Sequence, residues 1–224
     1  AVTALSKIII GTLDNIRRPA FCSLIPTYKG FSVMLDLGAN KESNENHLFQ
    51  FSIMGHAFSK INNIKNPKIA ILNIGTEEGK GKEYLQNSFN LISNSFLKSD
   101  FIGFIEPDKI TSGSADVIVT DGFTGNVALK TAEGTANFIS RNLKKSLNKF
   151  SVLLSFNSLK KFKNKLDPRK YNGAIFLGLN GPVVKSHGGT DALGFYYSID
   201  LCYKIVKGQL MQQIKSNLSH LKSD

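Results

Sequence analysis

The chain has 224 residues, of which 42% are apolar and 20% charged, so it is long enough for one substantial core and is globular in composition. Its apolar runs fall short of the roughly 18 residues of a membrane-spanning helix, and Cys22 and Cys202 lack the spacing of a zinc site or a disulfide framework. The net charge of +11 favours a polyanionic partner: an anionic membrane, an acidic protein or a nucleic acid.

The first half of the chain alternates between the patterns of helices and strands. Residues 1–15 carry apolar side chains at helical spacing and predict a helix. Two apolar, β-branched runs at 21–26 and 31–37 predict strands that are joined by a short turn. A helix is expected over 46–64, and the continuous apolar run at 68–75 predicts a strand that is buried on both faces.

The second half continues this alternation. The expected elements are a helix over 83–96, strands over 101–105 and 116–120, a long helix from about 124 toward 149, strands over 174–179 and 182–186, and a final helix over 191–221. Strands that alternate with helices predict a single α/β domain over residues 1–224, built of three layers with a largely parallel sheet.

Ligands of such sheets bind where the strands end in loops. Three polar loops follow expected strands and begin at Asp36, Thr76 and Asp121, and a fourth at 185–190 precedes the last helix. Because all four are rich in Gly, Asn, Asp or Thr, we expect the functional site among them.

The second loop contains Gly-Lys-Gly-Lys at residues 79–82. Small residues let backbone N–H groups approach an anion whose charge a lysine neutralises, so the loop is a candidate phosphate site. It is not a Walker A loop, because its spacing differs and Glu83 stands where Ser or Thr would bind magnesium. The alternative is a solvated turn with two surface lysines.

The third loop, Asp121-Gly-Phe-Thr-Gly-Asn126, leads from a strand into a helix that starts near Thr124. The unpaired N–H groups of a helix N-terminus carry partial positive charge and suit an anion or a developing oxyanion. The alternative is that Asp121 or Thr124 only caps the helix. In the fourth loop, His187 is a candidate for proton transfer or anion binding, or else a structural or exposed histidine.

Most of the net charge lies in residues 141–170, where ten basic residues face one acid, so this segment is +9 and the remainder +2. The basic residues are Arg141, Lys144, Lys145, Lys149, Lys160, Lys161, Lys163, Lys165, Arg169 and Lys170. Apolar residues between them favour a helix or helical hairpin on an anionic membrane or a protein partner. A core helix with a basic face is the alternative, and nucleic-acid binding lacks a supporting motif.

Five runs stand in one order along the chain: Leu-Asp-Leu-Gly-Ala-Asn at 35–40, Leu-Asn-Ile-Gly-Thr-Glu at 72–77, Asp-Val-Ile-Val-Thr-Asp-Gly-Phe-Thr-Gly-Asn-Val at 116–127, Tyr-Asn-Gly-Ala at 171–174 and Val-Lys-Ser-His-Gly at 184–188. Together they resemble the bacterial phosphate acyltransferases (acyl carrier protein:phosphate transacylases). The run at 116–127 is long and specific, and the resemblance covers essentially the whole chain.

The resemblance implies an α/β/α fold similar to that of phosphotransacetylases and of the isocitrate dehydrogenase-like proteins. It implies transfer of a fatty acyl group from acyl carrier protein to inorganic phosphate, without a cofactor or metal. The product is the acyl phosphate that a glycerol-3-phosphate acyltransferase uses in phospholipid biosynthesis. Family members carry roughly another hundred residues, a length in the single-domain range, before the helix at 1–15.

The same resemblance implies a cytoplasmic homodimer that associates peripherally with the inner face of the cell membrane. In it, residues 141–170 would form a projecting helical hairpin near the dimer interface, without nucleic-acid binding. The residues expected to contact the membrane are Phe150, Leu153, Leu154 and Phe156.

By resemblance, Lys80 and Asn126 are the candidate catalytic residues: Lys80 would neutralise phosphate or the oxyanion, and Asn126 would donate hydrogen bonds to the reacting centre. Phosphate is already a nucleophile, so no covalent enzyme intermediate is required. The candidate substrate- and phosphate-binding residues are Asp36, Asn40, Thr76, Glu77, Asp121, Gly122, Thr124, Gly125, Lys185 and His187. Asp36, Asn40 and Asp121 are expected to order their loops.

Two alternative functions remain at this point. A phosphotransacetylase that acts on acyl-CoA would share the site without needing the basic segment. A chain that only binds a membrane or a partner through residues 141–170 would form no acyl phosphate. A dehydrogenase fits least, because no Gly-x-Gly-x-x-Gly follows an expected strand.

Overall fold

The computed structural model describes residues 2–77, 79–147, 157, 173–186 and 188–219. At its centre is a mixed seven-stranded sheet of order β4-β3-β5-β2-β1-β6-β7. The strands are β1 (Ala20–Thr27), β2 (Gly30–Leu35), β3 (Ile69–Leu72), β4 (Phe101–Ile105), β5 (Val117–Val119), β6 (Ala174–Leu177) and β7 (Val184–Lys185). They lie close to the predicted runs.

The strand pairings confirm an α/β fold with a mostly parallel sheet. Strands β4, β3, β5 and β2 pair in parallel, whereas β1 is antiparallel to both β2 and β6, and β7 is antiparallel to β6. β6 therefore points the same way as β2, and only β1 and β7 run in the opposite direction among the described strands. Every residue of β3 and β5 is buried, as expected for central parallel strands that are covered on both faces.

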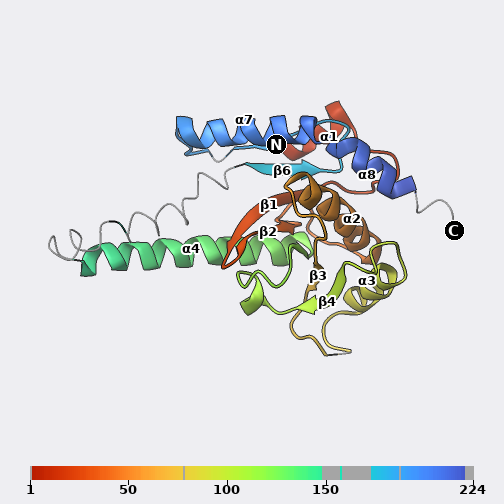
Figure 1. Ribbon diagram of the computed structural model, residues 1–224, viewed down its shortest axis with the longest axis horizontal. Helices are drawn as coiled ribbons and strands as arrows, with labels where there is room; N and C mark the ends of the chain where they lie inside the picture. Colours follow the sequence, from red (N-terminus) through yellow and green to blue (C-terminus); the bar gives the residue numbers. More distant parts are fainter. Residues whose placement is uncertain (1, 78, 148–156, 158–172, 187, 220–224) are drawn as a thin grey trace.

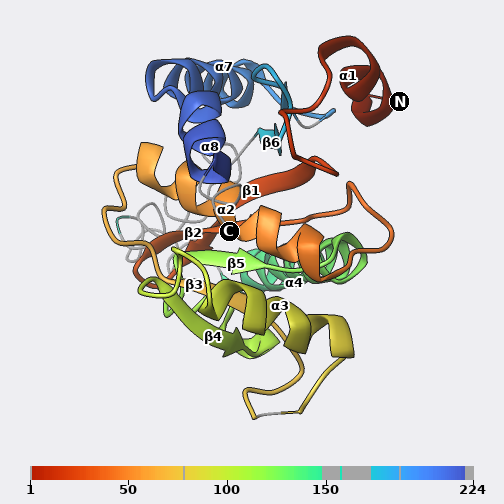
Figure 2. The ribbon, with the colours of Figure 1, turned by 90° about the vertical axis from the view of Figure 1, so that its right-hand side faces the viewer.

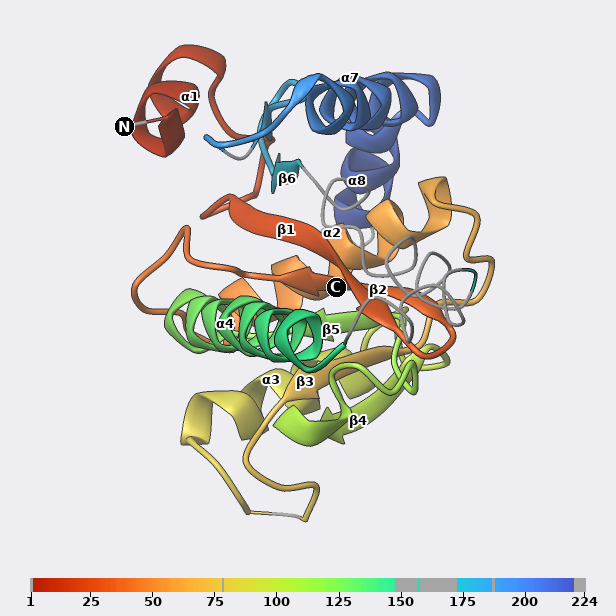
Figure 3. The same ribbon diagram turned by 90° about the vertical axis from the view of Figure 1, so that its left-hand side faces the viewer.

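The helices cover the two faces of the sheet unequally. They are α1 (Val2–Ile10), α2 (Glu45–Ile61), α3 (Glu83–Ser93), the 3-10 turn η1 (Pro107–Lys109), α4 (Gly122–Ser146), α7 (Ala192–Lys207) and α8 (Leu210–Ser219). The larger core lies between the sheet and the side of α2, α3 and α8, and the smaller core lies on the side of α4. Figures 2 and 3 show α4 across the sheet from α8.

Helix α2 is the central helix of the larger core. Asn44 caps its N-terminus by accepting the N–H of His47, and the His47 ring in turn accepts the N–H of Asn44. Nearly every residue from His47 to Ser59 is buried, because the sheet, α3 and α8 surround the helix. Sequence periodicity predicted only one buried stripe here, since it cannot show how many neighbours a helix has.

The last predicted helix is divided in two. The Gly208 backbone lies so close to Ile61 that a side chain would collide there, and Gln209 adopts a positive φ of 51°. The chain turns at these residues, and α8 buries Leu210, Ile214 and Leu218 in the larger core. The first predicted helix is shorter than expected, since α1 ends before Gly11, whose φ is 73°.

Helix α4 extends far beyond the sheet (Figure 1). Only Gly122 and Gly125 in its first turns are buried, and every residue from Lys130 to Ser146 is exposed. Only its last residues, 141–146, belong to the segment 141–170 that was predicted to form a hairpin. Phe150, Leu153, Leu154 and Phe156, like most of residues 141–170, lie outside the described residues, so the hairpin itself stays a prediction.

Candidate functional site

Three of the four predicted loops lie at one edge of the sheet. β2, β5 and β3 are parallel neighbours, so the loops that follow them, at residues 36–40, 73–82 and 121–122, leave the sheet side by side. This is the edge at which open α/β sheets bind ligands. The loop at 36–40 contacts the start of α4 at 121–122 directly. The loop at 73–82 is connected to them through the start of α3.

The loop after β2 is organised around the Asp36 carboxylate, which has no exposed surface. Its Oδ1 accepts the backbone N–H groups of Phe21 at 2.8 Å and Ala39 at 2.9 Å. Its Oδ2 accepts the backbone N–H of Asn40 at 2.9 Å and the Asn40 side-chain amide at 2.8 Å. Burial raises the pKa of Asp36, although these N–H donors act against the rise. The buried Asp36 carboxylate therefore fixes the conformation of the loop through its hydrogen bonds.

Helix α4 begins directly on top of this loop. A side chain at Gly122 would collide with the carbonyl oxygen of Asn40, and one at Gly125 would collide with the carbonyl oxygen of Asp36. The two glycines are therefore needed so that the first turn of α4 can lie flat on residues 36–40. The contact brings the N-terminal end of α4 to the sheet edge, beside the loop that follows β2.

Asn126 lies one turn into α4, above the same loop. It is exposed, and a side chain at Gly38 would stand 3.3 Å from the Asn126 Cβ. Gly38 also has a φ of 116°, which few other residues adopt. The Asn126 amide makes no hydrogen bond within the described part of the chain, so both its donor and its acceptor remain available to a ligand.

Asp121 caps α4 with both of its carboxylate oxygens. Oδ1 accepts the Thr124 N–H at 3.0 Å, while Oδ2 accepts the Thr124 hydroxyl at 2.7 Å and the Tyr84 hydroxyl at 3.1 Å. Partial burial acts to raise the pKa of Asp121, but these donors and the nearby Lys82 outweigh it and lower the pKa. Asp121 is therefore an ionised cap, as one of the two interpretations of this loop expected.

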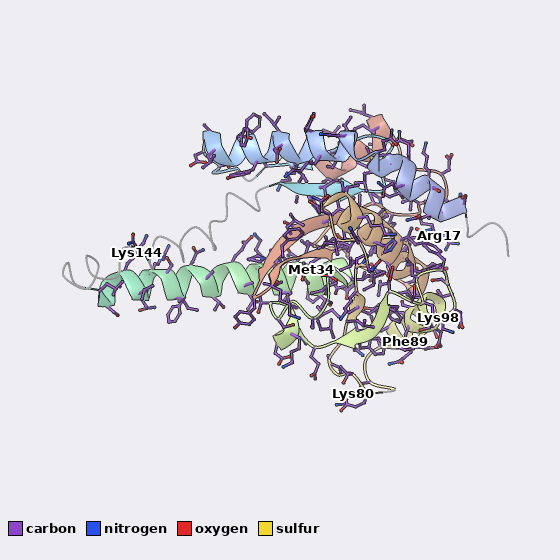
Figure 4. All side chains as sticks on the ribbon, in the orientation of Figure 1. Arg17, Met34, Lys80, Phe89, Lys98 and Lys144 are labelled. Carbon is purple, nitrogen blue, oxygen red and sulfur yellow. The ribbon has the colours of Figure 1, made fainter. Side chains whose placement is uncertain are left out.

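The 73–82 loop holds Lys80 away from this contact. The Lys80 Nζ lies 2.8 Å from the Glu77 carboxylate, both side chains are about half exposed, and Figure 4 shows Lys80 at the outer end of the loop. Pairing with Glu77 raises the pKa of Lys80, so the cation is retained. The backbone is well anchored, because the Lys80 carbonyl accepts the Asn73 amide at 2.9 Å and the Gln86 amide at 2.6 Å.

The structure brings together some of the predicted site residues and leaves others apart. One contact region is formed by Asp36, Asn40, Gly122, Gly125 and Asn126. Asp121 and Thr124 lie beside this region. Thr76, Glu77 and Lys80 are exposed in the neighbouring loop. His187 and the motif residues at 171–172 lie outside the described residues.

Lys185 on β7 approaches the first loop through Phe21. Its Nζ lies 5.9 Å from the centroid of the Phe21 ring, which also contacts Phe176. The Phe21 N–H donates to Asp36, so Lys185 and the Asp36 loop share one aromatic neighbour. Sequence reasoning missed Phe21 and Tyr84, although Tyr84 follows the Gly-Lys-Gly-Lys run and stands in the first turn of a predicted helix.

Other kinds of site find no support in the described residues. Both cysteines are free thiols, with Cys22 buried and Cys202 only partly so. The described residues hold no cluster of His, Cys, Asp and Glu that could bind a metal ion. Nor does any helix among them combine the length and apolar character needed to cross a membrane.

Comparison with known sequences identifies a family and several relatives that share one name. Residues 1–213 match the family described as fatty acid synthesis protein. The phosphate acyltransferase of Pelagibacter ubique is 47% identical, with 97% of this chain and 68% of that protein covered. Those of Rhodospirillum rubrum and Gluconacetobacter diazotrophicus are 46% and 47% identical over 98% and 99% of this chain, which spans 64% and 61% of their length.

Comparison with solved structures supports the fold. EutD phosphotransacetylase from Staphylococcus aureus and a phosphotransacetylase from Streptococcus pyogenes each superpose with a TM-score of 0.58. They cover 93% and 94% of this chain, which in turn covers 58% of each of them, at identities of 16% and 19%. Likeness at such low identity concerns the fold alone, and it confirms the predicted phosphotransacetylase-like α/β architecture.

Proposed function

This chain belongs to the fatty acid synthesis protein family and is a relative of the phosphate acyltransferases, and we propose that it transfers a fatty acyl group from acyl carrier protein to inorganic phosphate. The observation that carries the proposal is the exposed Asn126 amide beside the N-terminus of α4, held by two glycines on the buried Asp36 loop. An available side-chain amide beside a helix N-terminus suits a site where negative charge develops.

In the proposed reaction, a phosphate oxygen attacks the carbonyl carbon of the acyl thioester. A carbon–oxygen bond forms, the carbonyl oxygen becomes an oxyanion, and the carbon–sulfur bond then breaks. The products are acyl phosphate and the free thiol of the carrier, which takes up a proton. A thiolate with a pKa of roughly 8.5 is a good leaving group, so the protein need only orient the reactants and stabilise the oxyanion.

We assign the roles accordingly. Asn126, at the start of α4, donates hydrogen bonds from its side-chain amide to the reacting centre, and Lys80 neutralises phosphate or the oxyanion. The N–H groups of Thr124 and Gly125, which were also considered as donors, are bonded to Asp121 in this structure. Lys80 would have to exchange its Glu77 partner for the substrate, which an exposed ion pair permits because it contributes little to stability. Thr76, Glu77, Lys185 and His187 remain proposed contacts with phosphate or the carrier's prosthetic arm.

The donor distinguishes this proposal from the phosphotransacetylase alternative. Rates of acyl phosphate formation, measured by trapping with hydroxylamine, are compared for one acyl chain presented on acyl carrier protein and on coenzyme A. We expect the carrier-bound donor to be used at a higher kcat/KM. A higher kcat/KM for the coenzyme A thioester would favour the alternative, and no product from either donor would refute acyl transfer to phosphate.

We further propose that the exposed part of α4 from Lys130 to Ser146, here called the α4 arm, binds a polyanionic surface. This surface is either the inner face of the cell membrane or the acidic acyl carrier protein. Arg141, Lys144 and Lys145 are exposed on the α4 arm beside exposed Phe138 and Leu143. Basic side chains next to apolar ones favour adsorption to an anionic surface. The acyl phosphate formed there would be consumed by a glycerol-3-phosphate acyltransferase.

We also propose that the protein is a homodimer, as the resemblance implies. Support comes from the exposed large apolar residues along α4, which a second copy of the chain would cover. These residues are Phe123, Val127 and Ile139. Sedimentation equilibrium gives the mass directly: twice the mass of the chain is expected, and a monomer over the whole concentration range would contradict the proposal.

A further inference from the structure

The two proposed catalytic residues lie on different elements, Lys80 on the loop before α3 and Asn126 on α4. Transition-state stabilisation needs both at fixed positions, since small displacements reduce catalysis strongly. A contact that ties α3 to α4 at this edge would therefore matter for the reaction. Among the described residues, Tyr84 supplies it.

Tyr84 stands in the first turn of α3, immediately after the Lys80 loop. The side-chain amide of Gln86, also in that turn, donates to the Lys80 carbonyl at 2.6 Å, so the loop is fixed to α3 at this point. The Tyr84 hydroxyl donates to the Asp121 Oδ2 at 3.1 Å. Because Asp121 caps α4, two hydrogen bonds that start from one turn of α3 link the Lys80 loop to the N-terminus that carries Asn126.

The Tyr84 bond differs in kind from the other bonds of the cap. Thr124 lies on α4 itself, so its bonds to Asp121 hold the first turn of α4 together without connecting it to another element. Tyr84 comes from a separate helix, and its ring packs against the larger core, which fixes the position of its hydroxyl. Burial, together with the Asp121 carboxylate, raises the pKa of Tyr84 well above its usual value, so the hydroxyl stays a donor.

Lys82 adds positive charge at the same place. It is the residue before α3, its Nζ lies 5.9 Å from the centroid of the Tyr84 ring, and its charge acts to lower the pKa of Asp121. Ionised Asp121 thus faces a hydroxyl and a cation that both belong to the α3 side. The contact between the two helices is strongest while Asp121 carries its charge.

We propose that Tyr84 is a positioning residue, which holds the ionised cap Asp121 and thereby keeps the Lys80 loop and the Asn126 end of α4 in one fixed arrangement. The inference rests on the proposed function for the identity of the reaction. The contact itself is a matter of geometry and can be tested without activity.

The first test measures the Asp121 pKa in the full chain by NMR, with the carboxyl carbons of aspartate labelled, in the natural protein and in Tyr84→Phe. Phenylalanine keeps the packed ring and removes only the hydroxyl. A hydrogen bond to the charged form lowers a carboxyl pKa, so we expect a higher Asp121 pKa in the variant. An unchanged pKa would overturn the inference, whether or not the protein is active.

The second test follows kcat/KM for phosphate against pH. We expect Tyr84→Phe to lower kcat/KM by about tenfold to hundredfold, as for a lost hydrogen bond to a charged group, and to move the acid limb to higher pH. Tyr203→Phe is the matched control, because Tyr203 is exposed on α7, and it should match the natural protein. A Tyr84→Phe variant with a lower melting temperature but an unshifted acid limb would mean a packing role only and contradict the inference.

The two outcomes separate the inference from the proposed function. If the natural protein forms no acyl phosphate, the proposed function fails, and the Asp121 titration still decides whether Tyr84 holds the cap. If the protein is active but Tyr84→Phe changes neither the titration nor the acid limb, the inference fails while the function stands.

Discussion

Asp36 and Asp121 are two carboxylates at one edge of the sheet that have different structural roles. Asp36 is enclosed and accepts backbone N–H groups from four residues, so it fixes the loop on which α4 rests. Asp121 is also buried, at 9% relative exposure, but its pKa is lowered and it caps α4. The sequence motif marks both positions equally, and only their hydrogen-bond partners and the opposite shifts of their pKa values distinguish them.

Asn126 is the residue on which the proposed chemistry depends most. Replacement by alanine should lower turnover by about 10² to 10³, the usual cost of losing one oxyanion donor, with little effect on stability because the side chain is exposed. Asn142→Ala is the matched control on the same helix, since the Asn142 amide only donates to the Phe138 carbonyl. Nearly full activity in Asn126→Ala would remove the assigned role.

His56 predicts a pH dependence of stability that is separate from activity. Its Nε2 lies 3.0 Å from the Asp100 carboxylate, whereas its buried Nδ1 has no hydrogen-bond partner among the residues that the structure describes. Burial and Lys60 lower the His56 pKa below the ordinary value of 6.5, although Asp100 acts against them. The unfolded chain therefore binds the proton first, and the free energy of unfolding should fall as the pH falls below 6.5 toward the folded pKa.

His56→Gln removes this titration while an amide can still donate to Asp100. Urea unfolding at a series of pH values should show a shallower fall for the variant. Part of the dependence should remain, because the His47 pKa is also lowered, first by burial. An identical pH dependence in the two proteins would show that His56 does not titrate as described.

At the scale of elements, α4 is a helix with two unlike halves. Its first turns must approach the Asp36 loop closely and therefore need glycine, whereas the rest extends into solvent. The motif at 121–126 allowed a helix N-terminus to be predicted, but not the element against which it packs, because that contact depends on strand order. For the same reason periodicity located α2 without revealing its burial on all sides, and it missed the turn between α7 and α8.

The two halves of α4 predict opposite effects of the same substitution. Gly125→Ala should destabilise the fold by about 1–3 kcal/mol or more, because the new methyl group collides with the Asp36 carbonyl. Gly134→Ala should stabilise it by about 0.5–1 kcal/mol, since a side chain there meets only open space and alanine favours helix. Chemical denaturation measures both, and equal effects would contradict the described position of α4.

At the scale of the molecule, the protein combines a compact sheet with a charged arm. Figure 4 shows Lys144 near the far end of α4, well away from Met34 in the sheet. The α/β class and most strand positions could be predicted from the sequence, because buried parallel strands are continuous apolar runs. The antiparallel pair of β1 and β2 follows from the predicted short turn between them. The positions of β1 beside β6 and of β5 between β3 and β2 could not be predicted, since these pairings join distant segments.

Charge substitutions at two places test whether the position of the basic residues on α4 determines membrane binding. Lys144→Glu with Lys145→Glu should weaken binding to vesicles that contain anionic lipid by about thirtyfold or more, at about 1 kcal/mol per basic residue. Lys65→Glu with Lys98→Glu changes the net charge equally but on the body, where both lysines are exposed, and should have much less effect. Cosedimentation with vesicles gives the affinities. Equal losses would mean that only net charge matters.

The most direct test of the proposed acyl transfer identifies the molecule that accepts the acyl group. The full chain is incubated with long-chain acyl-acyl carrier protein and radiolabelled inorganic phosphate, and both released carrier thiol and labelled acyl phosphate are counted. Transfer to phosphate predicts one labelled acyl phosphate for each thiol released, with both falling together in Asn126→Ala. Release of thiol without labelled acyl phosphate would mean that water is the acceptor, and release of neither product would contradict acyl transfer altogether.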